Sequence, residues 1–179
     1  MNFATLVFYD TFEVVASLPP RMGLFRQDAA AEGRRLLTLR MPRAGEDENA
    51  ESVAWGWNVQ TSPKKWPQIH NLLGRMLRDA KARVAGDVEL GSIYLEMLDP
   101  GAALPWQTLT GAYIERFSRF HMALRTNPAA MMFSGNETFS PALGWLTAVN
   151  ARVRCSASND GAWSRIHLVV DVRKKEPVE

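Results

Sequence analysis

The sequence lacks the features that mark several classes of protein. It contains a single cysteine, Cys155, which excludes an internal disulfide and any Cys-rich metal site. It shows no leader of basic, apolar and small residues, and no uninterrupted apolar run of membrane length. Its charges nearly balance at a net +2, and lysines and arginines are scattered. We therefore expect a cytoplasmic protein that binds neither a membrane nor a nucleic acid.

The composition is that of a folded protein. Hydrophobic residues make up 46% and charged residues 22% of the 179 residues, which are ordinary globular values. A chain of this length suits one domain with a sizeable core and is short for two. We therefore expect a single domain over residues 1–179.

The apolar pattern changes along the chain. At about 66–85, apolar residues recur at steps of three and four, which predicts a helix. From Val88 onward, short apolar stretches are bounded by glycine, proline or asparagine, as is typical of strands. This order predicts an α+β fold that is mainly β, a sandwich or barrel. We expect its core at 88–173 and an N-terminal helical and strand extension at 1–87.

Five separated motifs follow one another in the second half of the chain. They are Pro100-Gly101, Arg119-Phe120-His121, Thr126-Asn127-Pro128, the segment SPALGW at 140–145 and the segment RIHLVVDV from Arg165. In order and spacing they resemble the aspartyl/asparaginyl β-hydroxylase family of 2-oxoglutarate-dependent oxygenases, over roughly residues 88 to 173. The resemblance implies a double-stranded β-helix, which is a jelly-roll or cupin-like barrel.

The resemblance places the family's iron ligands at three positions that carry other residues here. The first metal histidine and its carboxylate correspond to Gln107 and Leu109, and the second histidine corresponds to Cys155. A non-haem iron centre of this kind needs two imidazoles and one carboxylate. We therefore expect that the iron triad is lost, that no metal or other cofactor is used, and that conventional hydroxylation is absent.

The residues that bind the carboxylates of 2-oxoglutarate in the family are retained by position. They correspond to Arg119, His121 and Arg165. Arginine suits this task because its guanidinium donates two parallel hydrogen bonds to a carboxylate. The alternative is that both arginines pair with acidic residues of the chain, such as Asp171 or Glu96. The first interpretation predicts that 2-oxoglutarate or another small carboxylate is a ligand.

Four side chains are candidates for catalysis, namely Cys155, His121, His167 and Gln107. Cys155 near two cations is either a thiolate with a lowered pKa or an inert buried residue. The two histidines are either acid/base groups or plain interior residues. His167 alternates with Ile166 and Leu168, so we expect it to face the opposite side of its strand. Gln107 is a candidate hydrogen-bond partner for a substrate carbonyl.

Three aromatic residues are expected to border the same pocket, namely Trp106, Tyr113 and Trp145. The alternative for the two tryptophans is ordinary packing in the core or at its rim.

Three functions remain open from the sequence. The first is a metal-independent, non-oxidative enzyme that acts on a small carboxylate by isomerisation, cyclisation, elimination or hydrolysis. The second is a non-catalytic binding or regulatory protein. The third is an oxygenase whose metal has unusual ligands. The expected partner is a small carboxylate, and whether the chain forms an oligomer is left open.

Overall fold

The computed structural model describes residues 1–50, 53–84 and 87–175. Its strands are β1 (Phe3–Phe8), β2 (Arg26–Gln27), β3 (Arg34–Pro42), β4 (Trp55–Trp57), β5 (Val88–Leu98), β6 (Ser118–Arg125), β7 (Ala130–Ser134), β8 (Glu137–Phe139), β9 (Trp145–Val149), β10 (Cys155–Asn159) and β11 (Arg165–Lys174). Its α-helices are α1 (Phe12–Ala16), α2 (Pro67–Val84) and α3 (Ala112–Arg116), and its 3₁₀ helices are η1 (Pro19–Leu24) and η2 (Val59–Thr61).

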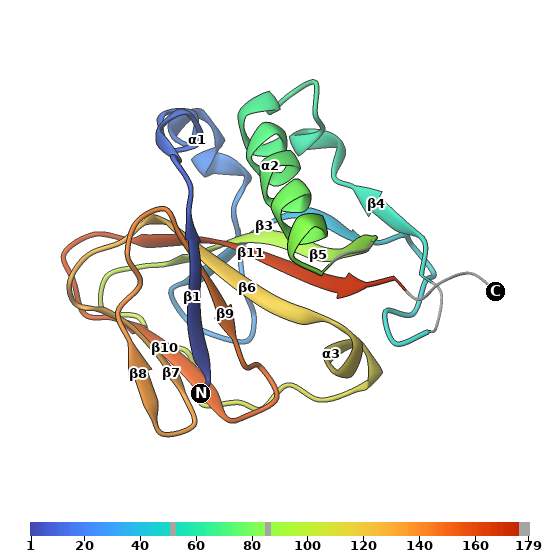
Figure 1. Ribbon diagram of the computed structural model, residues 1–179. Coiled ribbons are helices and arrows are strands. Elements are labelled where there is room, and N and C mark those ends of the chain that lie inside the picture. The colour runs from blue at the N-terminus through green and yellow to red at the C-terminus, as the bar shows by residue number, and fades with distance from the viewer. Residues whose placement is uncertain (51–52, 85–86, 176–179) are drawn as a thin grey trace.

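The described strands form two antiparallel sheets (Figure 1). The large sheet has the order β1-β9-β6-β11-β5-β3-β2, with β4 paired to β3, and the small sheet has the order β10-β7-β8. Strands from both sides of the expected boundary between residues 87 and 88 therefore share the large sheet. The N-terminal segment supplies strands to the barrel itself.

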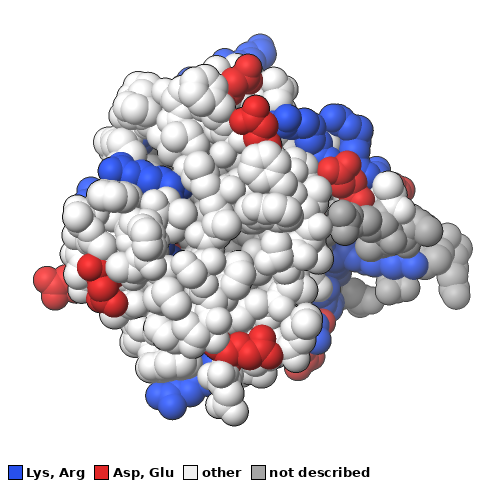
Figure 2. Space-filling view, turned by 60° about the vertical axis from the view of Figure 1, so that its left-hand side comes forward, with Lys and Arg blue, Asp and Glu red and all other residues white. Residues whose placement is uncertain are grey.

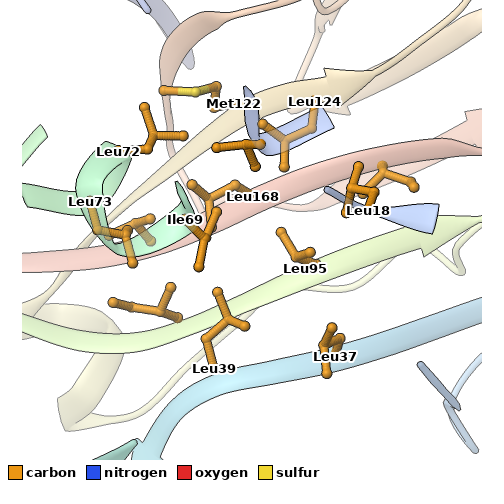
Figure 3. Close-up of a cluster of buried hydrophobic side chains, with 14 of the residues drawn as sticks. Leu18, Leu37, Leu39, Ile69, Leu72, Leu73, Leu95, Met122, Leu124 and Leu168 are labelled. Carbon is orange, nitrogen blue, oxygen red and sulfur yellow. The ribbon is translucent and has the colours of Figure 1, made fainter. Parts of the chain in front are cut away.

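The outer face of the large sheet packs against α2, as the sequence pattern predicts. Ile69, Leu72, Leu73 and Met76 form one stripe of this helix and are buried. They contact leucines of β3, β5, β6 and β11 (Figure 3). Burial of each such side chain contributes about 1.5–3 kcal/mol. Pro67 opens the helix, where a missing N–H costs little. The expected last residue of the helix, residue 85, lies outside the described part.

The inner face of the large sheet lies against the small sheet. Leu98 of β5 and Val149 of β9 pack on Met132 of β7 and Ala157 of β10. Along β11, Ile166, Leu168 and Val170 join the core under α2, so the residues between them point inward. This alternation directs Arg165, His167 and Asp171 to the space between the sheets, as expected for His167.

One side of the molecule carries few charged side chains. It is the side of α1 and β1, which Figure 2 brings forward. Two aromatic residues of these elements are exposed, Phe8 to 55% and Phe12 to 76%. None of the helices in the described ranges is long and apolar enough to span a membrane.

Candidate functional site

The site lies between the two sheets, where β5, β6 and β11 present polar side chains inward. In the antiparallel register, Asp171 lies opposite Arg119, and His167 lies opposite Glu96. Each polar residue alternates with apolar residues that face α2, so strand geometry alone gathers them on one face. These inward side chains form a layer of charged and polar groups inside an otherwise apolar barrel, which we call the charged layer.

Arg165 is fully buried and pairs with a carboxylate of the chain. Its Nη2 donates to Oε1 of Glu96 at 2.5 Å. The other oxygen of Glu96 accepts from Nε and Nη2 of Arg34, at 3.0 and 2.8 Å. Arg34 also donates to Asp28 at 2.6 Å. Burial opposes ionisation of Glu96, but Arg165 and Arg34 outweigh it and hold the pKa of Glu96 at about 2.

Arg119 is also paired within the chain. Its Nε and Nη2 donate to the two oxygens of Asp171, each at 2.8 Å, in a bidentate arrangement. The hydroxyl of Tyr113 donates to the same carboxylate at 2.8 Å and accepts from the backbone N–H of Ser92. Both arginines thus have the acidic partners that the sequence offered as the alternative to ligand binding.

The charges of this layer cancel. Three guanidinium groups, those of Arg34, Arg119 and Arg165, face three carboxylates, those of Asp28, Glu96 and Asp171. Bringing two further negative charges into so buried a layer would leave them without counter-charges, which is costly at low dielectric. A dicarboxylate such as 2-oxoglutarate therefore does not fit the layer as it stands.

The two interior histidines lie close together, with ring centroids 5.8 Å apart. Burial lowers the pKa of His121 to about 3. Burial, together with the charges of Arg165 and His121, also lowers the pKa of His167 well below its usual value. Both rings are therefore neutral over the physiological range. A neutral ring with so low a pKa is a poor general base near neutral pH.

Several buried nitrogens of the layer have no hydrogen-bond partner among the described residues. They are Nε and Nη1 of Arg165, Nδ1 of His121 and both ring nitrogens of His167. A buried donor left unsatisfied costs about 1–3 kcal/mol, so native structures usually supply a water to such atoms. The cavity beside them measures about 60 Å³, enough for water and far below the roughly 300–1,000 Å³ of ligand sites.

The three positions assigned to iron ligands by resemblance converge on this cavity. Gln107, Leu109 and Cys155 all line it, together with Arg119, His121 and Arg165. Gln107 and Cys155 face each other across an antiparallel bridge, with N–O distances of 2.9 and 2.7 Å. Their convergence is what a common metal centre requires of its ligand positions.

The side chains at these positions do not fit iron. An amide is a weak ligand, and leucine offers no donor atom. Burial raises the pKa of the Cys155 thiol, although Arg119 acts in the opposite direction. Desolvation outweighs the cation, which favours the second interpretation, an inert buried thiol. Among the described residues, no three histidine, cysteine, aspartate or glutamate side chains are grouped to hold a metal ion.

The three aromatic residues expected around the pocket are not among the described residues that line the cavity. Trp106 is 46% exposed and packs on Phe133, which is itself a lining residue. Trp145 is 41% exposed and contacts Phe8. Tyr113 lies in a separate cluster and reaches the layer through Asp171. Strand alternation could not place Trp106 and Tyr113, because both lie outside the strands.

The Thr126-Asn127-Pro128 motif has a structural task. The buried Asn127 donates from Nδ2 to Oδ1 of Asn159 at 2.8 Å and to the backbone oxygen of Trp163 at 3.1 Å. Its own oxygen accepts from the N–H of Ala129. The motif thereby ties the β6–β7 turn to the β10–β11 turn at one end of the barrel.

Sequence reasoning did not find Arg34 and Asp28, which complete the charged layer. One available signal was Glu96, a lone carboxylate in the strand segment GSIYLEML whose neighbours on both sides are apolar. A buried carboxylate at such a position needs cationic partners. In the structure, Glu96 lies opposite Leu36 of β3, two residues from Arg34. The sequence does not show how β3 and β5 are aligned.

Comparisons with known proteins agree with this architecture. Residues 34–175 match the family model described as Aspartyl/Asparaginyl beta-hydroxylase. No curated protein matches the chain. Among solved structures, an oxidoreductase of the 2OG-Fe(II) oxygenase family from Burkholderia pseudomallei is similar at 14% identity and a TM-score of 0.69. The match covers 97% of this chain and 85% of that one.

Two further solved structures share the fold. A Pseudomonas putida prolyl-4-hydroxylase is 14% identical, with a TM-score of 0.60 and coverage of 98% and 94% of the two chains. HygX from Streptomyces hygroscopicus, with nickel and 2-oxoglutarate bound, is 10% identical, with a TM-score of 0.62 and coverage of 97% and 83%. These matches confirm the double-stranded β-helix expected from the sequence.

The comparison with HygX also corrects one expectation. We expected no metal or other cofactor, yet a structure of this fold holds nickel and 2-oxoglutarate. The expectation that the chain uses no cofactor is therefore not supported by the comparison.

Proposed function

Because the chain belongs to the aspartyl/asparaginyl β-hydroxylase family, we propose that it is a non-catalytic, regulatory member whose family pocket is filled by its own ion pairs. The observation that carries this proposal is Glu96, whose carboxylate pairs with both Arg34 and Arg165. In the family resemblance, Arg165 is the residue that grips the cosubstrate. Here a carboxylate of the protein, that of Glu96, accepts from Nη2 of that guanidinium.

A non-oxidative enzyme receives less support from the same geometry. General acid/base catalysis works best when the pKa of the catalytic group lies near the operating pH. The pKa of His121 is held at about 3, and burial raises the pKa of Cys155. No carboxylate-binding arginine of the layer lacks an acidic partner within the described residues. The candidate roles of Gln107 and His167 in catalysis therefore stay predictions.

The proposal is tested by calorimetric titration of the protein with 2-oxoglutarate. The wild-type protein should give no heat of binding, and it should form no succinate when supplied with Fe(II) and oxygen. Glu96→Gln frees Arg165 and should bind a small carboxylate more tightly than the wild type. Glu89→Gln, which removes the carboxylate of the separate pair with Arg173, is the matched control and should not gain binding.

Two outcomes contradict the proposal. One is succinate formation by the wild-type protein. The other is wild-type binding of 2-oxoglutarate that is lost in Arg165→Leu/Glu96→Leu, a double variant that removes both members of the pair and so avoids an unpaired buried charge. The expected lack of nucleic-acid and membrane partners and the cytoplasmic location stay predictions.

A further inference from the structure

A second cavity lies outside the barrel, between α2 and the outer face of the large sheet. Its volume is about 380 Å³, within the range of small-molecule sites and several times that of the interior cavity. One wall is formed by Leu73, Met76, Leu77 and Ala80 of α2. The opposite wall is formed by apolar residues of the sheet, namely Leu6, Leu90, Phe120, Leu146 and Val172. We call this cavity the α2 groove.

The walls of the α2 groove are incompletely covered by the protein. Leu6, Leu90, Phe120 and Val172 pack against the main core but remain partly exposed. Free energy is gained when an apolar ligand removes such surface from water. A concave site of mostly apolar residues with a few polar groups at its edge is the usual form of a ligand pocket.

The polar groups of the groove are unevenly distributed. Arg116, Arg173 and Lys174 lie at the end formed by β11 and by the start of β6. Asp79, the one carboxylate among the described lining residues, lies on the β1 side, where it accepts from the hydroxyl of Tyr9 at 2.7 Å. In the sheet, β9 and β6 separate β1 from β11. The groove therefore has a cationic end and an apolar body.

Two of the three cations lack a carboxylate partner among the described residues. Arg173 pairs with Glu89 at 2.7 Å. Arg116 donates only to the backbone oxygens of Ala112 and Glu48, and Lys174 is exposed with no ion pair. This end of the groove therefore keeps an excess of positive charge that is complementary to an anionic head group.

We infer that the α2 groove binds an amphiphile with an acyl chain and an anionic head, the chain against α2 and the head at Lys174 and Arg116. This site is independent of the interior layer, and so of the proposed function. Most of the described residues along the groove are apolar, so its length suits a hydrocarbon chain and would leave the groups of a polar chain largely unpaired. The two cations without carboxylate partners select a carboxylate or phosphate head over a neutral one.

The test is calorimetric titration of the full chain with dodecanoate, with dodecanol as the uncharged match of the same chain length. Dodecanoate should bind with one-to-one stoichiometry, and more tightly than dodecanol. Lys174→Gln and Arg116→Gln should each weaken dodecanoate binding about two- to five-fold at low salt. Lys64→Gln, which removes an exposed charge away from the groove, is the control and should leave the affinity unchanged.

The apolar part of the site is tested by filling it. Ala80→Phe from the helix and Leu6→Phe from the sheet should each abolish dodecanoate binding, and the melting temperature shows that each variant is folded. Binding unchanged in both folded variants would overturn the site. Equal affinity for dodecanol, with no effect of Lys174→Gln, would overturn the anionic head. A wild-type dimer that Ala80→Phe converts to a monomer in sedimentation would instead assign the groove to a second copy of the chain.

Discussion

Arg165 donates from Nη2 to Oε1 of Glu96 across 2.5 Å, and both side chains are almost completely withdrawn from solvent. The two residues lie on neighbouring strands, β11 and β5, at the centre of the large sheet. The pair thus belongs both to the centre of the large sheet and to the candidate site. Its removal is expected to affect stability and ligand binding together.

Glu96→Gln should be strongly destabilising. The change leaves the buried Arg165 without its carboxylate partner and removes one of the two carboxylates that pair with Arg34. Loss of one partner of a buried ion pair costs about 3–5 kcal/mol. The measurement is the free energy of unfolding in urea. Glu89→Gln, in the partly exposed pair with Arg173, should cost at most about 1 kcal/mol. Equal costs for the two variants would show that burial does not set the strength of the Glu96 pair.

The protein should lose stability in acid in two stages. The pKa of His121 is about 3 in the folded protein, against the ordinary value of 6.5 for histidine, so the unfolded chain binds more protons between these values. Stability should therefore fall as the pH drops below 6.5, by about 1.4 kcal/mol per pH unit for each such histidine. His167, whose pKa is also lowered by burial, adds to this slope.

The second stage belongs to Glu96. Its pKa is about 2 in the folded protein, against the ordinary value of 4.5 for glutamate, so its contribution is complete above pH 4.5 and is lost as the pH falls toward 2. Urea unfolding at a series of pH values measures both stages. His121→Asn should reduce the slope between pH 6.5 and 4.5. A slope that is unchanged in this variant would contradict the neutral buried histidine.

Cys155 should be slow to react. Burial raises the pKa of its thiol and so reduces the thiolate that alkylating agents attack. Mass spectrometry after treatment with iodoacetamide at neutral pH should show slower modification of the folded protein than of the chain in urea. Faster modification in the folded state would show that Cys155 is an activated thiolate, which is the other interpretation of the sequence.

The assignment of the former ligand positions can be tested by rebuilding them. In Gln107→His/Leu109→Asp/Cys155→His, two imidazoles and one carboxylate would line the same cavity. This variant should bind Ni(II) more tightly than the wild-type protein in calorimetric titration. The variant without the Leu109→Asp change is the matched control and should bind more weakly. No gain in the triple variant would mean that the three positions are not the ligand positions of this barrel.

Local pattern in the sequence predicted much of the fold. The spacing of Ile69, Leu72 and Met76 located α2. The alternation around His167 predicted correctly that it faces away from Ile166 and Leu168. The order of the motifs predicted the barrel through their resemblance to the β-hydroxylase family. These features depend on residues close in sequence.

Features that depend on register between distant strands were not predicted. The pairing of Phe3 in β1 with Val149 in β9 joins segments from opposite ends of the chain, and no local pattern indicates it. The partners of Glu96 follow from the register of β3 on β5. The burial that raises the pKa of Cys155 likewise comes from strands far along the chain, so the sequence could not choose between a reactive and an inert thiol.

The place of β11 in the large sheet has a consequence for how the chain reaches this structure. β11 follows all the other described strands in sequence, yet it lies between β6 and β5 and joins the β1-β9-β6 half to the β5-β3-β2 half. Without β11, these two halves have no described strand that joins them into one sheet, and β6 and β5 each present an unpaired edge. The large sheet is therefore completed only when β11 is in place, through contacts that close long loops. Such folding is slow and prone to aggregation.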